Sequence, residues 1–293
     1  MAIRFDLQSH STNSDGALSA CEVVQRAADA GVELLALSDH DTISGVSEAI
    51  AAGREAGVRV VPAVEISAVD EGSPVPRELH ILGYDIDHTG PVLTERLAEF
   101  LADREQRTLR MGAALVELGF ELDEEQLQAR VAAGKPIGRP HLAEAVLSAP
   151  ANASRLQAEE IDDIGSLIRG YLIEGKPAFR LRETPTVAQA IEAIHEASGV
   201  AIWAHPFWDI SDPDEVLSSI DRFVALGIDG VEAFYVSHTR EQTELIASRC
   251  AELGLLTTGS ADYHGPDNRL FSRFLAFETY GIEPNLGTIG SQG

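Results

Sequence analysis

The sequence predicts an α/β barrel whose strands alternate with crossover helices and are interrupted by an all-helical insertion. Short apolar runs typical of buried strands alternate with helical patterns of about 10 to 15 residues. Residues that can bind metal ions follow several of these runs, and α/β barrels keep their active sites at the C-terminal ends of their strands. The length of 293 residues is that of one such barrel, with or without an insertion.

The first part of the chain contains four strand patterns. Two helical patterns, each followed by a glycine, separate the first three strands. Because consecutive parallel strands need such crossover helices, we expect a parallel sheet. The expected strands are residues 3–7, 34–37, 58–64 and 78–84, and the expected helices are residues 20–30 and 43–55.

The alternation stops after residue 92 and resumes after residue 182. Helical patterns cover 95–118, 124–133, 141–147 and 161–172, and no convincing strand pattern occurs between them. We therefore expect two parts: a barrel made of residues 1–92 and 183–293, and a helical insertion over residues 93–182.

The last part of the chain returns to strands alternating with helices, which brings the total to about seven strand–helix units. The tail after Glu283 is glycine-rich, and we expect it to be loosely held. The expected helices are residues 187–197, 213–226 and 240–253, and the expected strands are residues 200–204, 230–234 and 255–260.

The net charge of −25 argues against stable binding to long nucleic acids, which depends on Lys and Arg neutralising phosphates. The charge is unevenly distributed. Residues 101–182 hold 11 of the 22 basic residues and 13 of the 47 acidic ones, so nearly all the net negative charge lies elsewhere. We expect the middle of the chain to contact an anionic substrate.

The sequence also bears on the cellular compartment. It has no run of about 18 apolar residues, so we expect no membrane span. The N-terminus lacks the charged and apolar regions of a signal peptide. Cys21 and Cys250 fall in helical patterns far apart in sequence, so we expect no disulfide framework and a cytoplasmic location.

Nine side chains with donor atoms for metals lie in or just after the strand patterns. Five imidazoles and three carboxylates meeting at one barrel mouth need a counter-charge, which divalent metal ions supply. Imidazole and carboxylate suit Zn, Mn or Fe, and one carboxylate can bridge two ions. The candidate ligands are Gln8, His10, Asp15, His40, Glu65, His80, His205, Asp262 and His264.

These motifs resemble the polymerase and histidinol phosphatase (PHP) family, an amidohydrolase-like group of metal phosphoesterases. The resemblance rests on five motifs in the family order: residues 6–10 with 14–16, residues 38–41, Glu65, residues 204–206 and residues 259–264. It implies a distorted (β/α)7 TIM-like barrel that holds two or three divalent ions. It also implies that the helical insertion covers the active site.

By position in the motifs, the resemblance implies three ligand groups. Glu65 belongs to two of them and would bridge two ions. This chain departs from the family at Gln8, where the family has histidine, and an amide oxygen is a weaker ligand than imidazole. The implied groups are Gln8, His10, Glu65 and Asp262; Glu65, His80 and His205; and Asp15, His40 and His264.

The expected reaction is the hydrolysis of a phosphate ester. A water between two ions becomes a hydroxide nucleophile near neutral pH, so we expect Glu65, His205 and Asp262 to be needed for catalysis. Residues 139–141, Arg-Pro-His, resemble a motif of the branch that acts on nucleotides and short oligonucleotides. The expected substrate contacts are Arg104, Arg107, Arg139, His141, Tyr235 and His238, and Trp208 is a candidate for stacking on a base.

We therefore predict a metal-dependent phosphatase acting on a nucleotide-sized substrate, such as a nucleoside 3′,5′-bisphosphate or a nucleoside monophosphate. One alternative is a 5′-to-3′ exonuclease that shortens RNA or DNA oligonucleotides with the same ions. Another, of a different class, is a non-catalytic metal-binding module, which the replacement of histidine by Gln8 leaves open.

Overall fold

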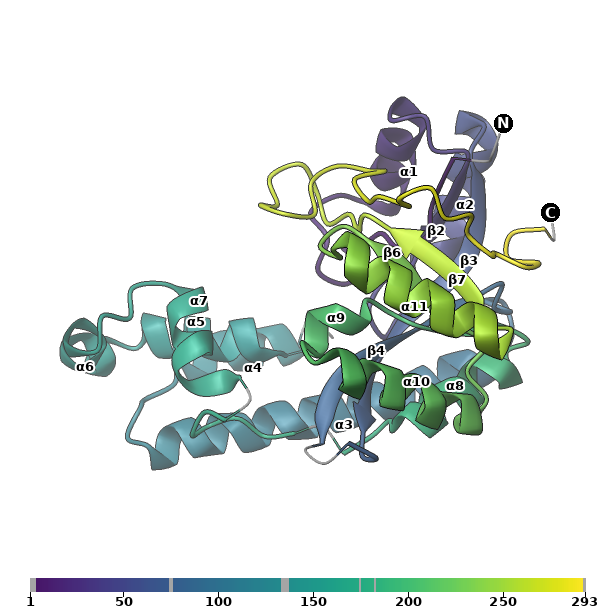
Figure 1. Cartoon of the computed structure of the whole chain (residues 1–293). Helices are drawn as coiled ribbons and strands as arrows, with labels where there is room; N and C mark the ends of the chain where they lie inside the picture. Colours follow the sequence, from purple (N-terminus) through teal and green to yellow (C-terminus); the bar gives the residue numbers. More distant parts are fainter. Residues whose placement is uncertain (1–3, 74–75, 133–136, 174, 182, 292–293) are drawn as a thin grey trace. The chain divides into compact units, whose positions relative to one another are not determined.

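The computed structural model describes residues 4–73, 76–132, 137–173, 175–181 and 183–291. The chain forms two compact units, Met1–Leu97 with Pro185–Gly293, and Ala98–Thr184. We call them the barrel unit and the helical unit. Figure 1 labels their helices and strands.

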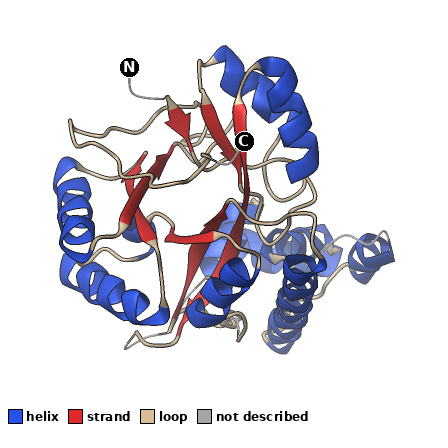
Figure 2. Cartoon of the chain, turned by 90° about the vertical axis from the view of Figure 1, so that its right-hand side faces the viewer, coloured by secondary structure: helices blue, strands red, loops and turns tan. Residues whose placement is uncertain are grey.

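The barrel unit is built on a seven-stranded sheet in which each strand pairs with its neighbours in sequence. The sheet closes back on itself because Leu7 donates its N–H to the carbonyl of Gly259 and Ser9 forms a parallel bridge with Tyr263. Figure 2 shows the resulting ring of strands with helices outside it. The strands are β1 (Phe5–Asp6), β2 (Leu34–Leu37), β3 (Arg59–Asp70), β4 (Arg77–Tyr84), β5 (Val200–Trp203), β6 (Gly230–Tyr235) and β7 (Leu256–Ser260).

The expectation of an all-parallel sheet is wrong at β4, which runs antiparallel to both β3 and β5. The connection between β3 and β4 is too short to hold a crossover helix, so the two strands form a hairpin. Pairing within this hairpin extends β3 beyond its predicted end at residue 64 as far as Asp70, which pairs with Arg77. The reversal brings the first half of β4 to the C-terminal ends of the parallel strands, and His80 lies in that half.

Amphipathic helices cover the outside of the barrel. Three of them begin with a Ser or Thr whose side chain accepts a hydrogen bond from the third residue of the helix, which stabilises the exposed N–H groups. Three end at a glycine with positive φ, a conformation that other residues adopt at a cost. The outer helices are α1 (Ala20–Asp29), α2 (Val46–Ala56), α8 (Val187–Glu196), α10 (Pro213–Leu226) and α11 (Arg240–Leu253). A short helix, α9 (Pro206–Asp209), follows β5.

Apolar side chains from the strands fill the barrel interior, among them Leu7, Leu34, Tyr84 and Ile202. The C-terminal tail belongs to this core, which corrects the expectation that it is loosely held. Ile289 is 5% exposed and packs in the same cluster, while Arg59 donates to the carbonyl of Gly290 at 2.8 Å. Burial of apolar side chains therefore holds a glycine-rich segment in place.

The described part of the helical unit contains helices and no strand. Its own apolar core includes Leu115, Phe120, Leu142 and Leu172. Sequence patterns missed α6, whose six residues are too few for a clear period. The helices are α3 (Pro91–Glu117), which begins in the barrel unit, α4 (Glu124–Ala132), α5 (Arg139–Ser148), η1 (Pro150–Asn152), α6 (Ala153–Ala158), α7 (Ile164–Leu167) and the π-helical turn η2 (Ile168–Leu172).

Two expectations about the insertion stay predictions: its placement at residues 93–182 and its covering of the active site. Within the described residues, no helix combines the length and the apolar composition needed to cross a membrane.

Candidate metal centre

The carboxylate of Glu65, on β3, is the centre of the site, and its side chain is 1% exposed. Its two oxygens face different groups. Oε1 lies 2.7 Å from His80 Nδ1 and 3.2 Å from His205 Nε2. Oε2 lies 3.1 Å from His10 Nε2 and 3.6 Å from His40 Nδ1. A carboxylate whose oxygens divide the surrounding imidazoles in this way has the geometry to bridge two cations.

Asp262, two residues after the end of β7, completes one side of this arrangement. Its Oδ1 lies 3.1 Å from His10 Nε2 and 3.5 Å from His264 Nδ1, and the hydroxyl of Tyr235 donates to Oδ2 at 2.8 Å. The tyrosine fixes one carboxylate oxygen, which leaves the other directed at the histidines.

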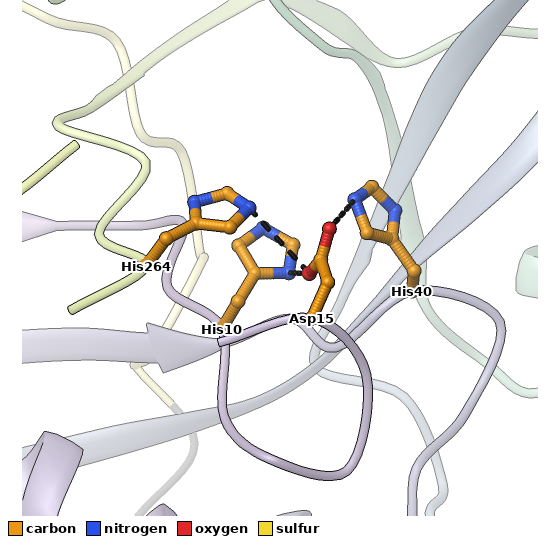
Figure 3. Close-up of side chains that lie close together, drawn as sticks. All are labelled: His10, Asp15, His40 and His264. Atoms are coloured by element: carbon orange, nitrogen blue, oxygen red, sulfur yellow. Dashed lines mark ion pairs between the residues drawn. The ribbon is translucent and has the colours of Figure 1, made fainter. Parts of the chain in front are cut away.

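A third group gathers around Asp15, as Figure 3 shows. The oxygens of Asp15 lie 3.6 Å from His10 Nδ1, 3.7 Å from His40 Nε2 and 3.5 Å from His264 Nε2. The Asp15 side chain is 54% exposed, whereas that of Glu65 is buried. This third group is therefore the one nearest to solvent.

The backbone that carries these residues is held by buried polar contacts. Asp39 accepts hydrogen bonds from the N–H and hydroxyl of Ser11 and from the hydroxyl of Ser14, all at 2.7 Å. These bonds shape the loop that presents Asp15. His205 and Asp262 have φ values of 29° and 53°. Non-glycine residues adopt positive φ at a cost, and such strain is concentrated at functional sites.

The packing of acids and imidazoles shifts their pKa values in opposite directions. Burial by itself would raise the pKa of Glu65, but the surrounding histidines hold it well below its usual value. Burial lowers the pKa of His205, yet Glu65 and Asp209 raise it to about 10. For His40, burial dominates and lowers the pKa to about 4. When no metal is bound, a protonated imidazole such as that of His205 therefore supplies positive charge next to Glu65.

The residues fit divalent metal ions, and buried polar atoms without a hydrogen-bond partner carry this conclusion. Such atoms are costly unless a ligand satisfies them. They include His10 Nδ1 and Nε2, His40 Nδ1, His205 Nδ1 and Asp262 Oδ1. Three groups have donor atoms close enough to share an ion: His10, Asp15, His40 and His264; His40, Glu65 and His80; and His10, Glu65 and Asp262. The first contains the implied group of Asp15, His40 and His264 and adds His10, the second has His40 where the motifs imply His205, and the third lacks Gln8. The ligand roles stay predictions.

Gln8 is 1% exposed and is engaged in hydrogen bonds. Its amide nitrogen donates to Glu65 Oε2 at 2.8 Å, and its amide oxygen lies 3.2 Å from the hydroxyl of Ser260. That hydroxyl is also 2.6 Å from Glu232 Oε1, and burial raises the pKa of Glu232 to about 8. A protonated Glu232 can donate to Ser260, and Ser260 can then donate to Gln8. Gln8 therefore contacts the Glu65 carboxylate as a hydrogen-bond donor.

Four further residues around the site were missed by the sequence reasoning. Asp6 and Glu232 lie within apolar strand patterns, and a charged residue in a buried run was the available signal. Asp6 accepts from the N–H groups of Ala261 and Leu275, and burial raises its pKa to about 7. Glu232 accepts from the N–H of His205 at 2.9 Å. Asp209 lies 3.7 Å from His205 Nδ1, and the ring of Phe271 contacts that of His264. No sequence pattern marks either residue.

Two expected substrate contacts lie at the end of β6 and just after it, Tyr235 and His238. Tyr235 lies beside Asp262, as described above. His238 is 5% exposed, its Nδ1 lies 3.1 Å from the carbonyl of Ala233, and burial lowers its pKa to about 4. His238 is therefore a neutral imidazole near pH 7, and its contact with substrate stays a prediction.

The other expected contacts lie in the helical unit, and the roles of all four stay predictions. The side chain of Arg104 lies outside the described residues. Arg107 is 6% exposed and donates its Nε–H to the carbonyl of Arg180 at 2.7 Å. Arg139 is the first residue of α5 and is partly buried. His141 Nδ1 accepts from the N–H of Gly138 at 3.0 Å, which fixes the start of the same helix.

A closed seven-stranded α/β barrel with this histidine–carboxylate cluster at its mouth defines an amidohydrolase-like, metal-dependent hydrolase. The PHP domain family matches residues 6–152, and the chain belongs to this family. A 5′-3′ exoribonuclease of Haemophilus influenzae is 36% identical over 91% of this chain and 92% of its own length. A 3′,5′-nucleoside bisphosphate phosphatase of Chromobacterium violaceum is 31% identical over 89% of this chain and 87% of its own length.

The fold is that of solved structures as well. An amidohydrolase from Chromobacterium violaceum, solved with bound sulfate and no metal, superposes with a TM-score of 0.75 and 29% identity. The match covers 92% of this chain and 90% of that one. The expected fold, a TIM-like barrel of the amidohydrolase type, is confirmed, and the protein is a metal-dependent phosphoesterase.

Proposed function

We propose that the protein releases phosphate from a nucleotide-sized phosphate ester, with a nucleoside 3′,5′-bisphosphate as the first candidate and a nucleoside monophosphate as the second. The single observation that carries this proposal is the division of the Glu65 oxygens between two groups of imidazoles. The Chromobacterium violaceum relative, which carries the name of a bisphosphate phosphatase, supports the choice of substrate.

Two or three divalent ions, Mn, Zn or Fe, would be held at this centre. Glu65, His10 and Asp262 would hold one, Glu65, His80 and His205 a second, and Asp15, His40 and His264 a third. Such ions supply an activated water and neutralise the charge that develops on the phosphoryl oxygens. The donor set of imidazole and carboxylate matches these metals better than Mg or Ca, which prefer oxygen alone.

The side chains themselves would orient the reacting groups. Glu65 and Asp262 are held in place by Gln8 and Tyr235, so their free oxygens keep one direction as substrate binds. Asp15 and His80 are the most exposed members of the centre, with side chains 54% and 28% exposed, so the phosphate would approach from their side. A neutral imidazole such as His238 stays uncharged near pH 7 and would accept a hydrogen bond from the substrate.

A second candidate is a 5′-to-3′ exonuclease acting on short RNA or DNA oligonucleotides. The name of the Haemophilus influenzae relative, which shares 36% identity across nearly the whole chain, favours it. The same centre would serve, because both reactions attack phosphorus with an activated water and both need the negative charge on the phosphoryl oxygens neutralised. The two candidates differ in what they release, phosphate or a mononucleotide.

The test is a comparison of products from metal-loaded protein. Adenosine 3′,5′-bisphosphate, adenosine 5′-monophosphate and a 5′-phosphorylated RNA pentamer are each incubated with protein loaded with Mn, Zn or Fe. Fast release of phosphate from the bisphosphate supports the first candidate, and release of mononucleotides from the pentamer supports the second. Chelation should abolish either activity, and adding the metal back should restore it.

A non-catalytic metal-binding module would give a third result. The protein would bind metal in defined stoichiometry, yet it would release nothing from any of these substrates. That outcome, obtained with each metal, would overturn the proposal.

A further inference from the structure

An aromatic wall lines one side of the metal centre. It consists of Trp208, Tyr235 and Phe271, which share a cavity of about 120 Å³ with His205, His264 and other candidate ligands. Pockets that enclose drug-sized ligands have volumes of about 300 to 1,000 Å³. The cavity is therefore too small to enclose a nucleotide, and a substrate whose phosphate lies at the centre must extend beyond the rim.

Trp208 stands at that rim in a position fixed by the metal centre itself. It lies in α9, the short helix that begins directly after His205. Its backbone N–H donates to the carbonyl of His205 at 2.8 Å. Trp208 is 52% exposed, whereas Trp203, on the neighbouring strand, is fully buried. An indole half in water forgoes apolar burial, so an aromatic ligand that covers it gains that burial.

Neighbouring rings support the wall on one side. The ring of Trp208 lies 5.5 Å from that of Phe271 and 6.4 Å from that of Tyr235, and Phe271 lies 5.3 Å from the ring of His264. The backbone of Phe271 is pinned as well, because its carbonyl accepts from the N–H of His264 at 2.9 Å. One side of the indole is therefore supported, and the exposed remainder is preorganised for a planar ligand.

The chemistry of the wall selects the class of ligand. Aromatic side chains stack on nucleobases through π-faces that every base has, so they bind a base without reading its identity. The rings carry no charge that would bind a second phosphate. A planar, uncharged group attached to a phosphate ester is the ligand that fits both the wall and the centre.

We propose that Trp208, backed by Phe271 and Tyr235, forms a base-binding subsite on which the nucleobase of the substrate stacks while its phosphate lies at the metal centre. This inference rests on the proposed function and names the part of the substrate that the barrel unit recognises. It predicts that the protein prefers substrates with a nucleobase to sugar phosphates that lack one.

The first test uses tryptophan fluorescence, since the chain has two tryptophans and Trp203 is shielded from ligands. Metal-loaded protein is titrated with a non-hydrolysable phosphonate analogue of adenosine 5′-monophosphate and, separately, with methylphosphonate. We expect saturable quenching by the nucleotide analogue and none by methylphosphonate. Trp208→Phe should lose the quenching. Absence of quenching in the wild-type protein would overturn the subsite.

The second test compares kcat/KM for adenosine 5′-monophosphate with that for ribose 5-phosphate, which has no base. Trp208→Ala should lower the value for the nucleotide by about ten- to a hundredfold more than the value for ribose 5-phosphate. Trp208→Phe, which keeps a stacking ring, should recover most of the loss. Leu226→Ala, which removes an apolar side chain of α10 that is 45% exposed, serves as the control and should change neither value.

The outcomes separate this subsite from the proposed function. An equal loss for both substrates in Trp208→Ala would overturn the subsite and leave the phosphatase intact. Wild-type protein that releases phosphate from neither substrate would overturn the phosphatase, while saturable quenching by the nucleotide analogue would still support a base-binding site.

Discussion

The two compact units use their charged residues differently. In the barrel unit, imidazoles and carboxylates converge on Glu65, and several of their buried atoms have no hydrogen-bond partner. In the helical unit, Arg155 lies 3.8 Å from the ring centroid of Phe120 and donates to the carbonyl of Leu118, and Arg107 donates to the carbonyl of Arg180. Those arginines stabilise the packing of their own unit.

This difference shows how a site for a ligand differs from a structural cluster. Structural charges find their partners within the protein, because a buried group without a partner costs free energy. The barrel unit instead gathers imidazoles and carboxylates around Glu65 and leaves several of their buried atoms without a hydrogen-bond partner, which an added cation can satisfy. We therefore expect the chemistry to reside in the barrel unit and the helical unit to contribute binding alone.

The strongest way to break this comparison is to remove a ligand. Asp262→Ala and His205→Ala should each lower kcat by more than about a hundredfold, because loss of even an outer partner of a metal ligand costs 10- to 100-fold. Phosphate release and bound metal per protein are the measurements. The far-ultraviolet circular dichroism should stay unchanged.

His195→Ala is the matched control for these variants. His195 is a half-exposed histidine that lies 2.8 Å from Asp229 on the surface of the same unit, so its removal should change kcat by less than about twofold. A ligand variant that is pure, folded and as active as this control would refute the assignment of the centre.

The second prediction concerns pH. The pKa of His205 is raised to about 10 without metal, so near pH 7 this imidazole is charged and pairs with Glu65. The pairing stabilises the metal-free fold fully below the unfolded pKa of about 6.5, and this contribution is lost as pH rises through about 10. A metal ion needs the neutral imidazole and must displace the proton.

Metal affinity should therefore rise between pH 7 and pH 10, by up to about tenfold per pH unit for each proton displaced. Titration calorimetry at pH 7 in buffers with different ionisation enthalpies measures the protons released. Binding heats that do not depend on the buffer would contradict the charged state of the histidines.

The sequence predicted which residues of the barrel unit meet, because the ends of parallel strands bring the residues that follow them to one end of the barrel. Residues that follow a parallel strand within a few positions lie near the barrel mouth, so the sequence positions of His10, His40 and Asp262 predicted that these side chains would meet there. Their roles as ligands stay predictions. The reversal of β4 was not predicted, since periodicity does not tell the direction of a strand. His80 nevertheless reaches the site, because the hairpin brings it there.

The helical side was less predictable. A helix presents side chains on every face, so spacing does not tell which arginine faces a ligand and which packs within the unit. Arg107 illustrates the problem, because it is buried and bonded to the backbone. Contacts such as that of Phe271 with His264 depend on tertiary structure and leave no local pattern.

The third prediction sharpens the comparison within the metal centre at Gln8. Gln8→His should raise the affinity for the ion near His10 and Asp262 by about tenfold or more, because imidazole is a stronger ligand than an amide. Metal retained after dialysis against a fixed concentration of chelator measures the change. Gln8→Ala, which offers no ligand and removes the hydrogen bond to Glu65, should retain less metal than Gln8→His. Equal retention by the two variants would show that residue 8 does not reach the ion.

The smallest predicted effect belongs to the helical unit. We expect Arg139 to bind a second, non-reacting phosphate through a charge-assisted hydrogen bond from its guanidinium. Arg139→Ala should then lower kcat/KM for adenosine 3′,5′-bisphosphate by about tenfold and change the value for the monophosphate much less. Most of the change should appear in KM. Arg169→Ala, which removes an exposed arginine of the same unit, should leave both values unchanged. An equal loss for both substrates would remove the role in binding a second phosphate, and a fall in kcat as large as that of Asp262→Ala would break the division of labour between the two units.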